Sequence, residues 1–297
     1  MFNIILETKL LRTTLKLIII ENLMSAISIT TKYRKVLVFL GLTFGLNWGL
    51  AITYFSLGNN LNSKLFLPMA LIYMLIPATV AVLVQKFIYK LPVKRPLGIS
   101  LILNRWFAVA WILPFILAIF NILTDSLMTT SRLQPSLFHL GMAIFNLLTI
   151  NTFFTSFFTF GEELGWRGML LAELKNLSFF KANLIIGVIW GIWHAPLILA
   201  GYNYPQHPKI GLLLFVFQCI LLSNIFSYLR LKAKSVIASS IVHAAYNASA
   251  SLVYMFIGNV NDLIVGVCGI CGISVLLIVN ILIYLFDKNL NTLMLDC

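Results

Sequence analysis

The sequence predicts an all-α fold, a polytopic membrane bundle of about eight transmembrane helices with both termini in the cytoplasm. Composition is the first reason: of 297 residues, 60% are hydrophobic and only 10% are charged, whereas a soluble domain usually carries about 25% charged residues. Apolar runs of spanning length recur along the chain, and basic residues concentrate in alternate connecting segments. These features exclude a free cytosolic enzyme, a secreted disulfide scaffold and a disordered chain.

The first element is a basic amphipathic N-terminal segment over residues 1–35. It mixes apolar patches with Lys9, Arg12, Lys16, Lys32, Arg34 and Lys35. Such a pattern is typical of a helix that lies on a membrane surface. Lys9, Arg12 and Lys16 interrupt the apolar stretch that a signal peptide would need. We therefore interpret the segment as a cytoplasmic segment that precedes the first transmembrane helix.

Eight apolar runs follow, each close to the roughly 20 residues that a helix needs to cross the hydrocarbon core. They lie near residues 36–57, 65–84, 106–124, 138–160, 183–201, 210–229, 235–257 and 263–286. Together they define a transmembrane bundle over 36–288, with a short C-terminal tail over 289–297.

The distribution of basic residues predicts the orientation of this bundle. Of 21 Lys and Arg residues, 18 fall on segments that are cytoplasmic if the N-terminus is inside, and only Lys64, Arg132 and Lys209 fall outside. Basic residues favour the cytoplasmic side of membrane proteins. The net charge of +12 is therefore explained by topology, so the lipid bilayer is an expected partner and nucleic acid is not.

Two rows of glycine predict where helices pack closely. Gly41, Gly45 and Gly49 recur at four-residue spacing in the first run, as do Gly187 and Gly191 in the fifth. Small residues at this spacing let helix backbones approach one another in membranes.

Three runs carry polar residues at depths where lipid does not tolerate them unless they face protein, water or a partner. The residues are Glu162, Glu163 and Arg167 at the end of the fourth run, Trp190 and His194 in the fifth, and His243 and Asn247 in the seventh. A single buried His or Glu is more often a structural hydrogen-bonding group than a catalyst. Three such runs in a chain with few charges favour a functional site.

Helix geometry separates the two carboxylates. Glu163 and Arg167 are four residues apart, so they share a helix face and can form an ion pair. Glu162 points about 100° away from Glu163. Glu162 therefore remains available as a general base.

The other two clusters complement this carboxylate. His243 and Asn247 are also four residues apart and present two hydrogen-bond donors along one face, as a developing oxyanion requires. His194 lies near the middle of its run, where it could help Glu162 to hold and polarise a water molecule.

Taken together, the motifs E-E-x-x-x-R, aromatic-x-x-x-H and H-x-x-x-N resemble those of the CPBP group over roughly residues 137–250. That group comprises the type II CAAX prenyl endopeptidases and the bacteriocin-processing or Abi proteins. One departure is Trp190, where the usual pattern of the family has Phe, and it keeps an aromatic wall.

The resemblance implies an intramembrane endopeptidase with its protease core at about 137–250. It implies the catalytic residues Glu162, His194, His243 and Asn247 and the orienting residues Glu163, Arg167 and Trp190. Glu162 and His194 would activate water, and His243 and Asn247 would stabilise the oxyanion, with no cofactor. We expect a membrane-associated or lipidated peptide as substrate, the plasma membrane of a bacterium as location, and a site open to the cytosolic side.

Three alternatives remain open. Glu162, His194 and His243 are permitted zinc ligands with a fourth position left for water, but no H-E-x-x-H motif places two ligands on one helix turn, so we favour the metal-free mechanism. A non-catalytic bacteriocin self-immunity protein is the second alternative. A transporter with a proton relay ranks last, because the two halves of the chain do not carry corresponding helix breaks.

The depth of Glu162 adds one further expectation. Glu162 follows Phe138 by 24 residues, or about 36 Å of helix, which places it at the inner edge of the fourth run. For Glu162 to meet His194 and His243, this helix must start later than residue 138 and continue toward Leu171.

Overall fold

The computed structural model describes residues 33–130, 135–257 and 260–295, and the chain divides into two compact units, Met1–Gly41 and Leu42–Cys297. Of the first unit only residues 33–41 are described, and they form a turn and the beginning of a helix. The N-terminal segment predicted over 1–35 therefore lies almost entirely outside the described residues. The second unit contains all the predicted site residues.

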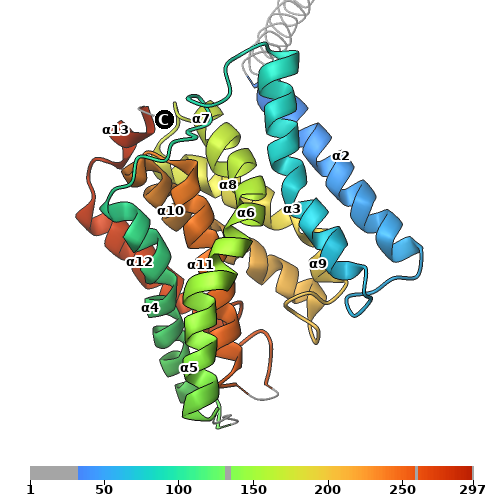
Figure 1. The fold of residues 1–297 in the computed structure, drawn as a ribbon, viewed down its shortest axis with the longest axis vertical. Coiled ribbons are helices and arrows are strands. Elements are labelled where there is room, and N and C mark those ends of the chain that lie inside the picture. The colour runs from blue at the N-terminus through green and yellow to red at the C-terminus, as the bar shows by residue number, and fades with distance from the viewer. Residues whose placement is uncertain (1–32, 131–134, 258–259, 296–297) are drawn as a thin grey trace, which may run out of the picture. The chain divides into compact units, whose positions relative to one another are not determined.

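The described elements are helical (Figure 1). In chain order they are α2 (Arg34–Ser56), α3 (Phe66–Val82), η1 (Leu83–Ile88), α4 (Arg105–Met128), α5 (Leu137–Asn146), η2 (Leu147–Asn151), α6 (Thr152–Glu163), η3 (Leu164–Leu170), α7 (Leu171–Glu173), α8 (Phe179–Trp193), α9 (Ala195–Leu199), α10 (Pro208–Ala233), α11 (Val236–Tyr254), α12 (Ile270–Phe286) and α13 (Leu290–Leu295). The three η elements are π-helical turns.

Each of the eight predicted runs has a helical counterpart, in the predicted order. Among the described residues, six helical segments are long and apolar enough to cross a membrane, and the two shorter apolar helices, Phe179–Trp193 and Ile270–Phe286, supply the other two. Because the hydrocarbon core requires backbone polar groups to be satisfied internally, helices of this kind are the expected spanning structure. The chain is an integral membrane protein with a helical bundle.

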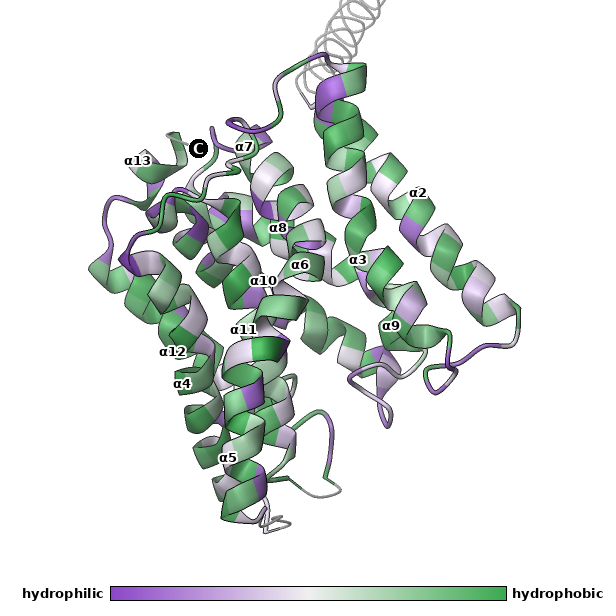
Figure 2. Ribbon diagram, in the orientation of Figure 1, coloured by the Kyte–Doolittle hydropathy of each residue, from purple (hydrophilic) through white to green (hydrophobic). Residues whose placement is uncertain are grey.

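The surface of the helices is apolar, as lipid contact requires. Large side chains such as Ile119, Phe153 and Ile278 are more than half exposed, and Figure 2 shows hydrophobic residues along most of the helical surface, with hydrophilic residues concentrated in the loops. In water this exposed area would oppose folding, whereas in hydrocarbon it costs nothing.

The fourth run is one continuous helical segment of 37 residues, Leu137–Glu173, about 56 Å long at 1.5 Å per residue. Its expected continuation past Leu171 is confirmed, but its expected later start is wrong, because the helix already begins at Leu137. None of the residues of α5 is buried, and this part of the helix contacts the core through the partly buried Leu140, which packs against Leu147, Ala248 and Leu252. Glu162 therefore lies about 16 Å from the carboxyl end of the helix rather than at its edge.

Only one of the two glycine rows packs as expected. A Cβ on Gly187 would lie 2.4 Å from the Cα of Ile220, and one on Gly191 would lie 2.7 Å from the Cα of Val216. These glycines let α8 pack directly against the backbone of α10. A Cβ on Gly45 or on Gly49 would meet nothing within 4 Å, so the packing role expected for the first row is not seen.

One end of the second unit gathers the loops rich in basic residues, and we call it the basic end. Three hydrogen bonds connect these loops: Val236 N–H to the Gly98 carbonyl (2.9 Å), Asn104 Nδ2–H to the Ala233 carbonyl (3.0 Å) and Phe179 N–H to Asn291 Oδ1 (2.9 Å). Lys232 also forms an ion pair with Asp287.

The loops at the other end of the same helices also contact one another, and we call this the opposite end. Gln206 N–H donates to Asp262 Oδ2 at 2.7 Å, and Tyr204 Oη–H donates to the Cys268 carbonyl at 2.6 Å. Chain segments 57–65, 200–207, 255–257 and 260–269 therefore lie at one end of the bundle (Figure 1).

Candidate active site

The four residues predicted to be catalytic line a single cavity of about 230 Å³. Its wall includes Glu162, Trp190, His194, His243 and Asn247, which come from four different helices or helix ends. The remaining wall is largely aromatic and aliphatic. A cavity of this size that combines apolar walls with a few convergent polar groups is the usual form of a small binding site.

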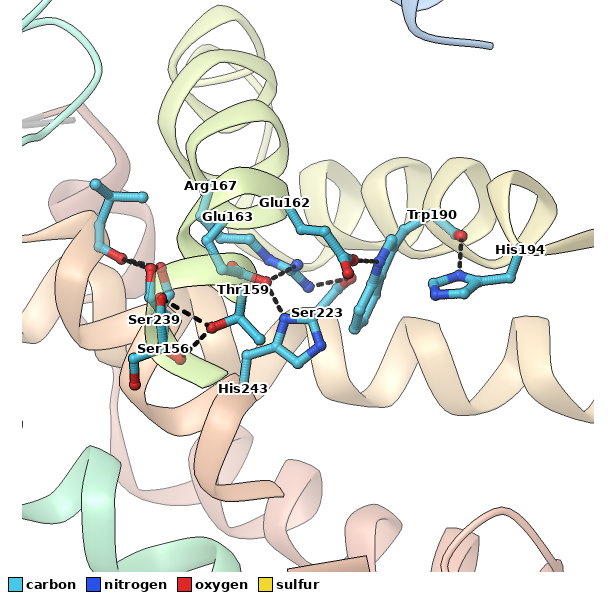
Figure 3. A network of polar contacts seen from close by, with 12 residues as sticks. Ser156, Thr159, Glu162, Glu163, Arg167, Trp190, His194, Ser223, Ser239 and His243 are labelled. Carbon is cyan, nitrogen blue, oxygen red and sulfur yellow. Dashed lines mark hydrogen bonds and ion pairs between the residues drawn. The ribbon is translucent and has the colours of Figure 1, made fainter. Parts of the chain in front are cut away.

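Glu163 is the centre of a buried polar network beneath this cavity (Figure 3). Its Oε1 accepts a hydrogen bond from Arg167 Nη1 at 2.9 Å and a second from His243 Nδ1 at 2.9 Å. Arg167 Nη2 also donates to Ser223 Oγ at 3.0 Å. The predicted ion pair of Glu163 with Arg167 is present, and it also holds the His243 ring from a third helix.

The guanidinium of Arg167 is fully buried, so its charge must be compensated by its neighbours. It lies 4.4 Å from the ring centroid of Trp190 and 5.1 Å from that of Phe226. Both distances permit cation–π attraction. One carboxylate, one hydroxyl and two aromatic faces thus surround the buried cation.

Trp190 contacts Glu162 and both histidines of the site. Its Nε1–H donates to Glu162 Oε2 at 2.9 Å, and its carbonyl oxygen lies 2.9 Å from His194 Nδ1. Its ring centroid lies 5.4 Å from that of His243 and 5.7 Å from that of His194. Figure 3 shows the indole between Glu162 and His194. The side chain is therefore more than the aromatic wall that the sequence predicts, because its N–H orients the proposed base.

The hydrogen-bond partner of His194 determines which of its two ring nitrogens can accept a hydrogen bond in the cavity. A main-chain carbonyl can only accept, so Nδ1 must carry the hydrogen that is donated to Trp190. In the neutral ring Nε2 is then an acceptor. His194 is suited to receive a hydrogen bond from a water molecule in the cavity.

The same reasoning constrains His243. Because the Glu163 carboxylate accepts at Nδ1, Nε2 of the neutral ring is an acceptor as well. His243 can donate to an oxyanion only when its ring carries a second proton. An adjacent buried carboxylate stabilises such an imidazolium, as it does in hydrolytic triads. Asn247 differs, since its amide donates in every protonation state.

Local sequence explains why these groups meet. A Cβ on Gly161 would lie 2.5 Å from the Met74 carbonyl, so glycine is required for α6 to approach α3 this closely. Thr159 Oγ1–H donates to the Ser240 carbonyl at 2.8 Å and ties α6 to α11. The π-helical turn η3 begins directly after Glu163, and such turns are frequent at functional sites.

Several residues of the site carry no signal that could be recognised in the sequence alone. Ser223 is an ordinary serine in an apolar run, yet its hydroxyl accepts from Arg167. Tyr73 Oη–H donates to the Trp193 carbonyl at 2.7 Å and closes one wall of the cavity. Phe215 packs 4.9 Å from the His194 ring. Their roles depend on contacts between helices distant in sequence.

The arrangement does not fit the alternative zinc site. Across the described residues, no three His, Cys, Asp or Glu side chains are grouped so that they could hold a metal ion. The set Glu162, His194 and His243 is therefore not arranged as three ligands, and we derive no step through a metal.

The lining of the cavity is concentrated toward one end of the bundle. Its wall includes Phe66, Tyr202 and Tyr254, which lie at or beside the loops of the opposite end. The wall includes no residue of the basic loops 89–104, 174–178 or 287–289.

Comparison with known proteins identifies the segment that carries the site. Residues 141–249 match the family model described as type II CAAX prenyl endopeptidase Rce1-like. This segment is therefore similar to the CAAX proteases. A curated relative, CAAX prenyl protease 2 of Methanococcus maripaludis, is 35% identical over 98 residues, which are 31% of this chain. The chain spans 36% of the length of that relative.

Within this matched segment lie all seven residues that the sequence singles out, from Glu162 to Asn247. The resemblance to CAAX proteases that the three motifs predict is confirmed. The departure at Trp190 is more consequential than expected, since a phenylalanine has no N–H to donate to Glu162.

Proposed function

We propose that the protein is an intramembrane endopeptidase that hydrolyses a peptide bond of a membrane-associated peptide or protein. The observation that carries this proposal is the convergence of Glu162, His194, His243 and Asn247 on one cavity within a bundle of apolar helices. The match of residues 141–249 to the type II CAAX prenyl endopeptidase family model supports the same reaction class.

In the proposed reaction, the Glu162 carboxylate removes a proton from a water molecule while the water oxygen attacks the scissile carbonyl carbon. The hydrogen bond from Trp190 Nε1 orients this carboxylate and leaves its other oxygen available. Nε2 of His194 accepts the second hydrogen of the water, which fixes the lone pair that attacks. General-base assistance of this kind contributes about 10²–10⁴-fold to a rate.

The tetrahedral intermediate then needs donors for its oxyanion. Asn247 supplies a neutral amide N–H, and the protonated His243 supplies Nε2–H, with Glu163 compensating its charge. When the carbon–nitrogen bond breaks, Glu162 returns its proton to the leaving amine. The products are a carboxylic acid and an amine, which together become a carboxylate and an ammonium once the acid passes its proton to the amine, and the active site regains its starting protonation.

The test uses purified protein in detergent added to membranes from a strain that lacks it, with new peptide termini detected by mass spectrometry. We expect wild type to generate termini that neither Glu162→Gln nor His194→Ala produces. His207→Ala is the matched control, because His207 pairs with Asp262 in the loops of the opposite end and does not line the cavity. Undiminished cleavage by both site variants would refute the proposal.

A further inference from the structure

Two cavities occupy opposite ends of the second unit, and their linings differ in charge. The site cavity has no Lys or Arg among its lining residues. A second cavity of about 390 Å³ is lined by four cationic residues, Lys94, Arg95, Arg230 and Lys234. The same helices therefore place the site toward one end and a concentration of positive charge at the other.

On α3, α10 and α11 most of the cavity lining lies toward the opposite end, whereas Glu162 lies nearer the basic end of its own helix. On α10 (Pro208–Ala233) the lining residues are Phe215, Gln218 and Leu222, all in its first part, whereas Arg230 in its last turn lines the basic cavity. Residue 222 and residue 230 are separated by about 12 Å along the helix.

The other long elements show the same asymmetry. On α11 the lining begins at His243 and extends to Tyr254, the last residue of the helix. On α3 it begins at Phe66, the first residue. The cavity thus extends from the level of Glu162 toward the loops 57–65, 200–207, 255–257 and 260–269.

The charge bias assigns these ends to the two sides of the membrane. The loops of the opposite end carry Lys64 as their basic residue, with Lys209 at the start of α10. The basic end carries the loop between η1 and α4 and the turn between α10 and α11. Because Lys and Arg near helix ends are retained in the cytoplasm, the basic end belongs on the cytoplasmic side.

We propose that the site cavity opens to the non-cytoplasmic side of the membrane and receives a peptide at that face. The substrate would be an exported or externally presented membrane-bound peptide rather than the C-terminus of a cytoplasmic protein. This inference rests on the proposed endopeptidase function and deepens it. It replaces the expectation of a cytosolic opening.

The rim of the cavity suits such a substrate. Phe66 and Tyr202 have ring centroids 5.9 Å apart, and both line the cavity together with Tyr254. Aromatic side chains favour the boundary between hydrocarbon and water. An apolar stretch of a membrane-bound peptide can contact these rings while its backbone enters toward Glu162.

The test is cysteine accessibility in intact cells, starting from a version in which all four native cysteines are alanine. Single cysteines are introduced as Ala250→Cys in the cavity wall, Asn62→Cys in a loop of the opposite end, and Asn176→Cys in a loop of the basic end. The probe is a small, negatively charged methanethiosulfonate that does not cross membranes. Labelling after permeabilisation serves as the total for each variant.

We expect Asn62→Cys and Ala250→Cys to react as completely in intact cells as after permeabilisation, and Asn176→Cys to react only after permeabilisation. Reaction of Ala250→Cys only after permeabilisation, or its failure to react in either condition, would overturn the inference. Labelling needs no catalysis, so loss of cleavage in the membrane-peptide assay would refute the enzyme proposal and leave this result intact.

Discussion

Replacing the two adjacent carboxylates one at a time separates the structural role from the catalytic role. Glu163→Gln removes the charge that compensates the fully buried Arg167, with which Glu163 pairs at 2.9 Å. Breaking a buried ion pair by removing one partner costs about 3–5 kcal/mol. Glu162→Gln also removes one negative charge, but the partner of this carboxylate is the neutral indole N–H of Trp190, which forms a hydrogen bond to it. We therefore expect the free energy of unfolding to fall by only roughly 1 kcal/mol.

The assay is equilibrium unfolding in mixed micelles, with the free energy of unfolding of each variant compared with wild type. We expect both variants to lose peptide cleavage, so stability is the measurement that distinguishes them. An equal loss of stability in the two variants, or a larger loss in Glu162→Gln, would refute the assignment of Glu163 as the structural carboxylate.

Four further predictions test separate features. Gly187→Ala places a Cβ 2.4 Å from the Ile220 backbone and is expected to lower the free energy of unfolding by about 1–3 kcal/mol. In the control variant Gly49→Ala the new Cβ meets open space, so the stability of the protein is not expected to fall. Asn247→Ala should lower kcat by roughly 10²–10³-fold with unchanged unfolding, because its side chain is exposed in the cavity. Trp190→Phe keeps an aromatic ring but removes the N–H to Glu162, so kcat should fall about 10-fold at constant KM in single-turnover and steady-state assays. Treatment with a chelator should leave cleavage unchanged, with less than stoichiometric zinc by elemental analysis; loss of activity restored by zinc would contradict the metal-free mechanism.

Much of the fold could be predicted because lipid imposes simple rules on composition. Each predicted run can be recognised in the sequence by its length and its apolar content, and all eight have helical counterparts in the structure. The ion pair of Glu163 and Arg167 was equally predictable, because it is a contact within one helix and depends only on spacing.

Contacts between helices could not be read from spacing. Gly45 and Gly49 have the same four-residue period as Gly187 and Gly191, yet only the second pair meets another backbone. The side of the bundle on which the cavity opens is also a property of how the helices are assembled. Sequence motifs placed the polar residues at membrane depth but carried no information on which loops surround the entrance.

The 37-residue helix that carries Glu162 is longer than the membrane it must cross. At about 56 Å it exceeds a hydrocarbon thickness of about 30 Å, and a helix in this situation tilts, bends or protrudes. None of its first ten residues is buried, and Leu140 is the one that packs against the buried cluster of Leu147, Ala248 and Leu252, so few contacts fix their inclination. Lipid acyl-chain length would then set the tilt of this helix and the vertical level of its carboxylate, so bilayers of different thickness become a means of tuning hydrolysis without altering a single residue.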